Sequence, residues 1–183
     1  SIEEAITRLR KEVEDSNKRS EDVIRELHER DKESLEEVRE IIKRLKDKVR
    51  TLLEEVDKRV KSERLERVRR LLERVDRVVD KVLRELKKLV EDSNELVKKV
   101  ATESHKINED IKKVVDDAAR RIETEEILKE VLKRLRKLLE DNERVLDEAR
   151  RRVEKTNEEI KEVLKRVAEE VDRLIKEVRE EVE

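Results

Sequence analysis

The positions expected to face a core follow one another at steps of three or four residues, and this spacing most constrains the fold. In the first third of the chain, the series runs without a break from Ile2 to Val60. Such steps match the 3.6 residues per turn of an α-helix and place all members on one face. The next step, from Val60 to Leu65, is five residues, and so is the step from Ile122 to Ile127. These two slips in phase predict three helices.

The predicted helices cover residues about 2–61, 63–122 and 125–182, with Ser62 and Thr124 as N-caps in the gaps. Neighbouring helices joined by such short turns must run antiparallel. We therefore expect one elongated domain over residues 1–183, an up-down-up three-helix bundle of nearly straight helices about 60 residues long.

A division into six short helices is the alternative, because serine and threonine recur at nearly even intervals at Ser34, Ser62, Ser93, Thr124 and Thr156. The stretches "SLEE" and "TNEE" also resemble capping boxes. However, the apolar phase passes through Ser34, Ser93 and Thr156 without a slip. We therefore favour three long helices.

The residue types that are missing support an all-α fold class. The chain has no Gly, Pro, Cys, Met, Phe, Tyr or Trp, whereas 56% of its residues are charged and 34% are hydrophobic. Strands and tight turns depend on several of these missing types. Disorder would explain the charge but not the periodic apolar residues.

Polar residues interrupt the apolar series at two levels of the predicted bundle. In an up-down-up arrangement, residue k of the first helix lies level with residues 123−k and 124+k of the other two. Polar residues of all three helices then coincide in height, and we expect two buried hydrogen-bonded networks. The first network consists of Ser16, Asn17, Ser20, Ser104, His105, Asn108 and Asn142. The second network consists of His28, Asp31, Ser34, Ser93, Asn94, Thr156 and Asn157.

These networks would fix the alignment of the helices. An unpaired buried polar group costs about 1–3 kcal/mol, so sliding one helix by a heptad would be penalised at every network position. Protonation of a buried His105 would also remove a hydrogen-bond acceptor, so we expect the bundle to loosen there on acidification. A nearby Asp31 would favour a charged His28 and oppose this effect.

The whole chain resembles computationally designed helical bundles with buried hydrogen-bond networks. The resemblance lies in the small set of residue types, the Val, Leu and Ile core positions, the Glu, Lys and Arg surfaces, and the discrete layers of Ser, Thr, Asn and His. It implies a de novo protein whose purpose is its own fold. The absence of Gly and Pro from the turns departs from the usual design of helix ends. Natural spectrin-like rods have a similar architecture, but they usually carry aromatic core residues.

The sequence gives little support to a metal-binding site or a catalytic site. His28 and Asp31 share a helix face, yet no second histidine stands at their level, and Arg25 and Thr102 occupy the positions that a Glu-x-x-His metal motif needs. We expect no metal, no cofactor and no enzymatic activity.

The sequence also bears on binding partners and on localisation. Acidic and basic residues alternate along every surface, which argues against nucleic-acid binding. No apolar run is long enough to cross a membrane, and no signal peptide begins the sequence, so we expect a soluble protein of unknown localisation. We expect a monomer, with self-association through edges such as Val97, Val100 or Val163 as the main alternative.

The expected function is therefore that of a designed structural scaffold without a natural biological role. Two alternatives stay open. One is a designed interaction or switch module, in which a helix is exchanged with a partner or the bundle responds to pH. The other is a natural coiled-coil spacer.

Overall fold

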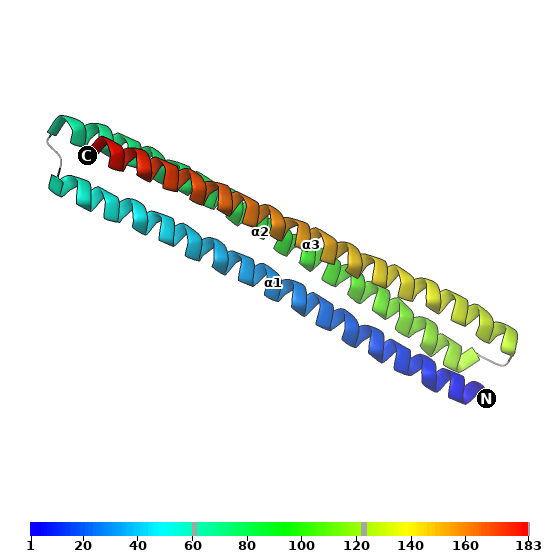
Figure 1. Cartoon of the computed structure of the whole chain (residues 1–183). Helices are drawn as coiled ribbons and strands as arrows, with labels where there is room; N and C mark the ends of the chain where they lie inside the picture. The colour runs from blue at the N-terminus through cyan, green and yellow to red at the C-terminus, as the bar shows by residue number, and fades with distance from the viewer. Residues whose placement is uncertain (60–61, 122–123, 183) are drawn as a thin grey trace. The chain divides into compact units, whose positions relative to one another are not determined.

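A computed structural model describes residues 1–59, 62–121 and 124–182 of the chain. It contains three helices, α1 (Ile2–Arg59), α2 (Ser62–Arg121) and α3 (Glu125–Val182), as Figure 1 shows. Within the described residues there is no strand. The predicted all-α fold class with three long helices is confirmed.

The helix ends carry the residues that helix ends favour. Acidic residues occupy the first turns and basic residues the last turns of all three helices, where they complement the helix dipole. The backbone N–H of Glu4 donates to the Ser1 hydroxyl at 3.3 Å, as in an N-cap. The Leu128 N–H donates to the Thr124 carbonyl at 3.3 Å, so Thr124 stands at the start of α3 as predicted. The predicted cap by the Ser62 side chain lies outside the described residues.

The six-helix alternative is wrong. Ser34, Ser93 and Thr156 each lie inside a continuous α-helix, more than twenty residues from either end. The apolar phase continues through these positions, and the core contacts that it provides outweigh the local capping preference of serine and threonine.

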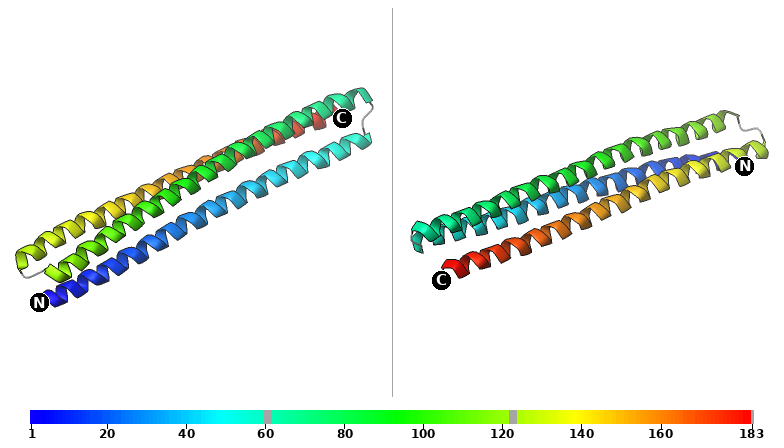
Figure 2. Two further views of the ribbon diagram at one scale, coloured as in Figure 1. Left: turned by 180° about the vertical axis from the view of Figure 1, so that it is seen from behind. Right: turned by 90° about the horizontal axis from the view of Figure 1, so that it is seen from above.

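The chain divides into two compact units, each built from a segment of every helix. Unit 1 comprises Ser1–Arg30 and Ser93–Glu154, and unit 2 comprises Asp31–Asp92 and Lys155–Glu183. In each unit the three segments lie side by side in all the views of Figures 1 and 2. In each unit the α2 segment runs antiparallel to the α1 and α3 segments. Each unit is therefore a three-helix bundle, and the single domain expected from the sequence stays a prediction.

Aliphatic side chains fill both units. Unit 2 has one continuous core, which includes Val38, Val79, Leu86 and Val178 at 0% exposure. Unit 1 has two apolar clusters. One cluster surrounds Leu27, Val97 and Leu146, and the other surrounds Leu9, Ile111 and Leu135. Buried polar side chains separate these two clusters.

Candidate functional site

The buried polar cluster of unit 1 lies between its two apolar clusters. Its five members come from all three helices, and each side chain is at most 8% exposed. Helix α1 contributes two serines, α2 a serine and an asparagine, and α3 one asparagine. The members are Ser16, Ser20, Ser104, Asn108 and Asn142.

Hydrogen bonds connect α1 to α2 within this cluster. The Ser16 hydroxyl donates to Oδ1 of Asn108 at 2.8 Å, and Nδ2 of Asn108 donates to the Ser20 hydroxyl at 3.0 Å. The Ser20 hydroxyl itself donates to the Ser16 backbone carbonyl at 2.8 Å. One asparagine of α2 therefore bridges two serines that lie one turn apart on α1.

Asn142 connects α3 to both other helices. Its Oδ1 accepts from the Ser104 hydroxyl of α2 at 2.7 Å. Its Nδ2 donates to the Ser20 hydroxyl at 2.9 Å and, more weakly, to the Ser16 hydroxyl at 3.5 Å. All side-chain oxygen and nitrogen atoms of the five residues therefore have a hydrogen-bond partner, which removes most of the penalty of burying them.

Two residues of the first predicted network lie outside this cluster. Asn17 is only half-buried, and it is not one of the hydrogen-bonded members. The prediction that His105 is buried is wrong, because its side chain is 77% exposed and faces Glu109 at 3.8 Å. Ser104 and Asn108 point inward, and a rotation of about 100° per residue carries the neighbouring His105 outward. The expected loosening at His105 on acidification therefore loses its basis.

The residues of the second predicted network are divided between the two units. In unit 2, the half-buried Ser34 hydroxyl of α1 donates to Oδ1 of the buried Asn157 of α3. Asp31 of the same unit is 2% exposed, and Thr156 is half-buried.

The remaining members belong to unit 1. Ser93 is 5% exposed, Asn94 is half-buried and His28 is exposed, so the expected burial of His28 is wrong. That the second set meets in one layer stays a prediction.

Ion pairs lie along the sides of both units. In unit 1, Arg19 pairs with Glu143 and Arg30 pairs with Glu154. In unit 2, Lys48 pairs with Asp172 at 3.3 Å. All three pairs join α1 to α3 at the same offset of 124 residues, so the two helices keep the expected alignment in each unit.

Two cations in such ion pairs, Arg19 in unit 1 and Lys46 in unit 2, have a raised pKa. The hydrogen bond from Arg19 to Glu143 raises the pKa of the guanidinium, and the attraction between the charges adds to it. The hydrogen bond from Lys46 to Asp80, 2.6 Å long, raises the pKa of the ammonium group. Both shifts favour the charged forms, which these groups already have at neutral pH, so neither group is poised to transfer a proton.

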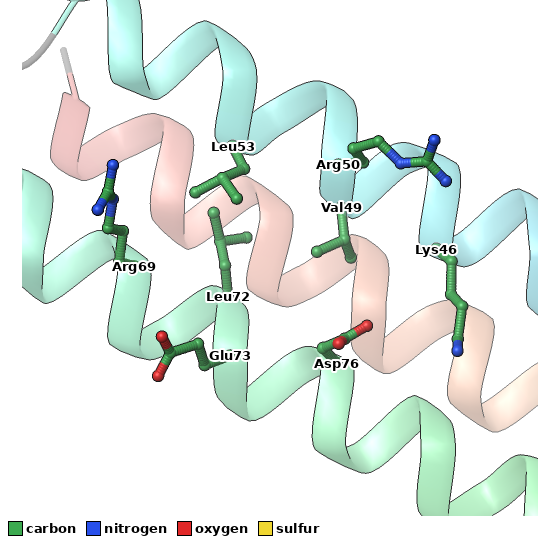
Figure 3. A pocket seen from close by; sticks show the side chains of 8 residues that line it. All are labelled: Lys46, Val49, Arg50, Leu53, Arg69, Leu72, Glu73 and Asp76. Atoms are coloured by element: carbon green, nitrogen blue, oxygen red, sulfur yellow. The ribbon is translucent and has the colours of Figure 1, made fainter.

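A groove between α1 and α2 of unit 2 has a volume of about 490 Å³. Figure 3 shows its floor, where Val49 and Leu53 of α1 lie opposite Leu72 of α2. Charged side chains of both signs stand around this floor, among them Lys46 and Asp76. The floor offers only aliphatic contacts, and no buried polar group of unit 2 belongs to the residues that line it.

Two further features bear on function. Among the described residues, no three His, Cys, Asp or Glu side chains gather closely enough to bind a metal ion. Searched over the same residues, the three helices contain no candidate for a membrane span.

Comparison with known proteins gives no relative. The chain matches no protein-family model, no curated protein sequence and no solved structure.

Proposed function

We propose that the chain is a de novo designed structural scaffold whose helix register is specified by its buried polar side chains. One observation carries this proposal. In unit 1, five buried Ser and Asn side chains from three helices bond to one another with all of their polar atoms. The small set of residue types and the lack of aromatic residues agree with design.

The cluster favours one alignment of the helices over its alternatives. If α3 moved by one heptad relative to α1 and α2, aliphatic residues would still meet aliphatic residues at most core positions. Asn142, however, would leave Ser20 and Ser104, and each buried group without a partner would cost about 1–3 kcal/mol. The summed cost of several such groups would equal a large part of the free energy of unfolding of a small domain.

We further propose that the chain is not an enzyme. The buried cluster consists only of hydroxyl and amide groups, which do not ionise near neutral pH and so cannot act as a general acid or base by themselves. Both histidines lie on exposed faces, away from the buried cluster.

Replacing the cluster by apolar residues tests the register proposal. The variant carries Ser16→Ala, Ser20→Ala, Ser104→Ala, Asn108→Leu and Asn142→Leu. We expect it to resist heat as well as the parent, because apolar residues can replace a satisfied polar network at little cost. We also expect it to lose uniqueness, with extra amide peaks in the NMR spectrum and more than one oligomer in sedimentation.

A double variant at half-buried positions, Asn17→Ala with Asn94→Ala, serves as the control and should keep a single set of amide peaks. The proposal fails if the apolar variant also gives one set of peaks and one oligomer, with the helices aligned as in the parent.

A further inference from the structure

Asp31 is the one ionisable side chain that is buried among the described residues. It is 2% exposed, whereas the other buried polar side chains are all serines and asparagines. It occupies a core position of α1, because Leu27, one turn earlier, and Val38, two turns later, are buried aliphatic residues on the same helix face. The environment of Asp31 therefore differs from that of the exposed acidic residues of the chain.

The polar side chains that lie inward near Asp31 in unit 2 are neutral. The half-buried Ser34 of α1 donates its hydroxyl hydrogen to Oδ1 of the buried Asn157 of α3. The ion pair between Lys48 and Asp172 sets the alignment of α1 and α3 in this unit, and it places Asn157 within one turn of Asp31 in height. Hydroxyl and amide groups can bond to either form of a carboxyl group, but they bring no positive charge to a carboxylate.

The charged side chains near Asp31 in height are exposed. Within one turn in unit 2 they are Lys32 and Glu33 of α1, Glu91 and Asp92 of α2, and Lys155, Glu158 and Glu159 of α3. On the preceding turn of α1, His28 and Glu29 are exposed, and Arg30 is paired with Glu154. Exposed charges of both signs act through water and are screened by salt, so their net effect on a buried carboxyl group is small.

Burial favours the neutral form of a carboxyl group. Moving a carboxylate out of water costs far more than moving a protonated carboxyl, which can donate one hydrogen bond and accept others. In the unfolded chain the same group is hydrated, and the ordinary pKa of an aspartate is about 3.9. Above this pH, folding therefore favours uptake of a proton at the buried position.

We propose that Asp31 is a pH-sensitive element that makes the folded chain less stable as the pH rises from mildly acidic to mildly alkaline. Above about pH 3.9 the unfolded chain has lost a proton that the folded chain still holds. The stability that this proton provides is complete below that pH and is lost as the pH rises through the higher titration midpoint of the folded chain. The sign is opposite to the acid loosening expected for a buried His105. The proposal does not rest on the register role of the cluster in unit 1.

A carbon-13 NMR titration of the native chain tests the protonation directly. The Cγ resonance of Asp31, assigned in the parent itself, follows the charge on its carboxyl group. We expect a titration midpoint of about 6 or higher, roughly two units above the ordinary aspartate value and within the range of fully buried carboxyl groups. A midpoint at or below about 3.9 would overturn the proposal.

Urea denaturation at about pH 5 and pH 8 tests the effect on folding. Between these values the unfolding equilibrium constant of the parent should rise about tenfold more than that of Asp31→Asn, as a midpoint near 6 implies. The two histidines and the exposed acidic residues are common to both chains, so their titration cancels in the comparison. Asp47→Asn is the control, because it makes the same change on α1 of unit 2 at a side chain that is 53% exposed. It should keep the pH dependence of the parent.

Two results of the denaturation experiment would also overturn the proposal. One is an equal pH dependence of the parent and Asp31→Asn. The other is an Asp31→Asn chain that is folded but less stable than the parent at about pH 8, because favourable contacts would then hold the ionised carboxylate. The NMR titration uses only the parent, so it decides the protonation state whether or not the variant folds.

Discussion

At the scale of single residues, Asn142 is the centre of the buried polar cluster. An asparagine side chain has one acceptor and one donor group, and here each is used toward a different helix: Oδ1 toward Ser104 of α2 and Nδ2 toward Ser20 of α1. No aliphatic residue can make both contacts. A serine at this position would be too short to reach two helices at once.

We expect Asn142→Ala to lower the free energy of unfolding by about 1–3 kcal/mol, because it leaves the buried Ser104 hydroxyl without its acceptor. Urea denaturation followed by circular dichroism measures the loss. Asn17→Ala, at a half-buried position next to the cluster, should change the same quantity by no more than about 0.5 kcal/mol. Equal effects of the two substitutions would show that the hydrogen bonds of Asn142 contribute no more to stability than a half-buried asparagine outside the cluster does.

For the buried polar cluster of unit 1, the sequence predicted the level of the polar residues better than the choice between neighbours. Ser16 is buried and Asn17 half-buried, while Ser104 is buried and His105 exposed. Adjacent residues differ by about 100° around a helix, and both members of such a pair can satisfy steps of three or four. Their polarity gives no further information, since a buried serine and an exposed histidine both interrupt an apolar series. Only the packing of the three helices decides which one points inward.

At the scale of elements, the ends of the helices were predictable because two signals coincide there. The apolar phase slips by one residue, and a capping residue such as Thr124 stands in the gap. Inside the helices, Ser34, Ser93 and Thr156 offer the capping signal without the slip, and α1, α2 and α3 pass through them. A weak local preference therefore yields to the continuous apolar face. The division into two units carries no such signal, because each unit mixes segments that are distant in sequence.

Proline substitution distinguishes a helix start from a helix interior. Glu125 is the first residue of α3, where the backbone N–H has no partner within the helix, so Glu125→Pro should change stability by less than about 1 kcal/mol. Asn94 would be the first residue of a helix capped by Ser93, but it lies inside α2. Asn94→Pro should therefore cost about 3 kcal/mol or more. Thermal melts of both variants measure the difference, and a mild effect at Asn94 would contradict a continuous α2.

At the scale of the whole molecule, ion pairs and the buried aliphatic core are the two candidates for the main source of stability. The chain carries 50 basic and 52 acidic residues, so opposite charges are nearly balanced. Most of the ion pairs join exposed side chains, such as Arg44 and Glu40 at 2.8 Å, and such pairs contribute about 0–1 kcal/mol each. A single fully buried leucine contributes more than several of them.

We therefore expect the truncation of one core side chain to change the free energy of unfolding by more than the screening of all surface charges does. Leu86 lies at 0% exposure in the core of unit 2, and Leu86→Ala should lower the free energy of unfolding by about 2–5 kcal/mol. Raising the salt concentration to about 1 M, where the screening length falls to about 3 Å, should change it by less, because lost attractions and lost repulsions largely cancel. Urea titrations of the parent at low and high salt, and of Leu86→Ala and Arg44→Ala at low salt, make the comparison. Arg44→Ala is the control for loss of one exposed pair and should change the free energy by at most about 1 kcal/mol. A salt effect larger than that of Leu86→Ala would mean that ionic contacts, and not the aliphatic core, stabilise the folded chain.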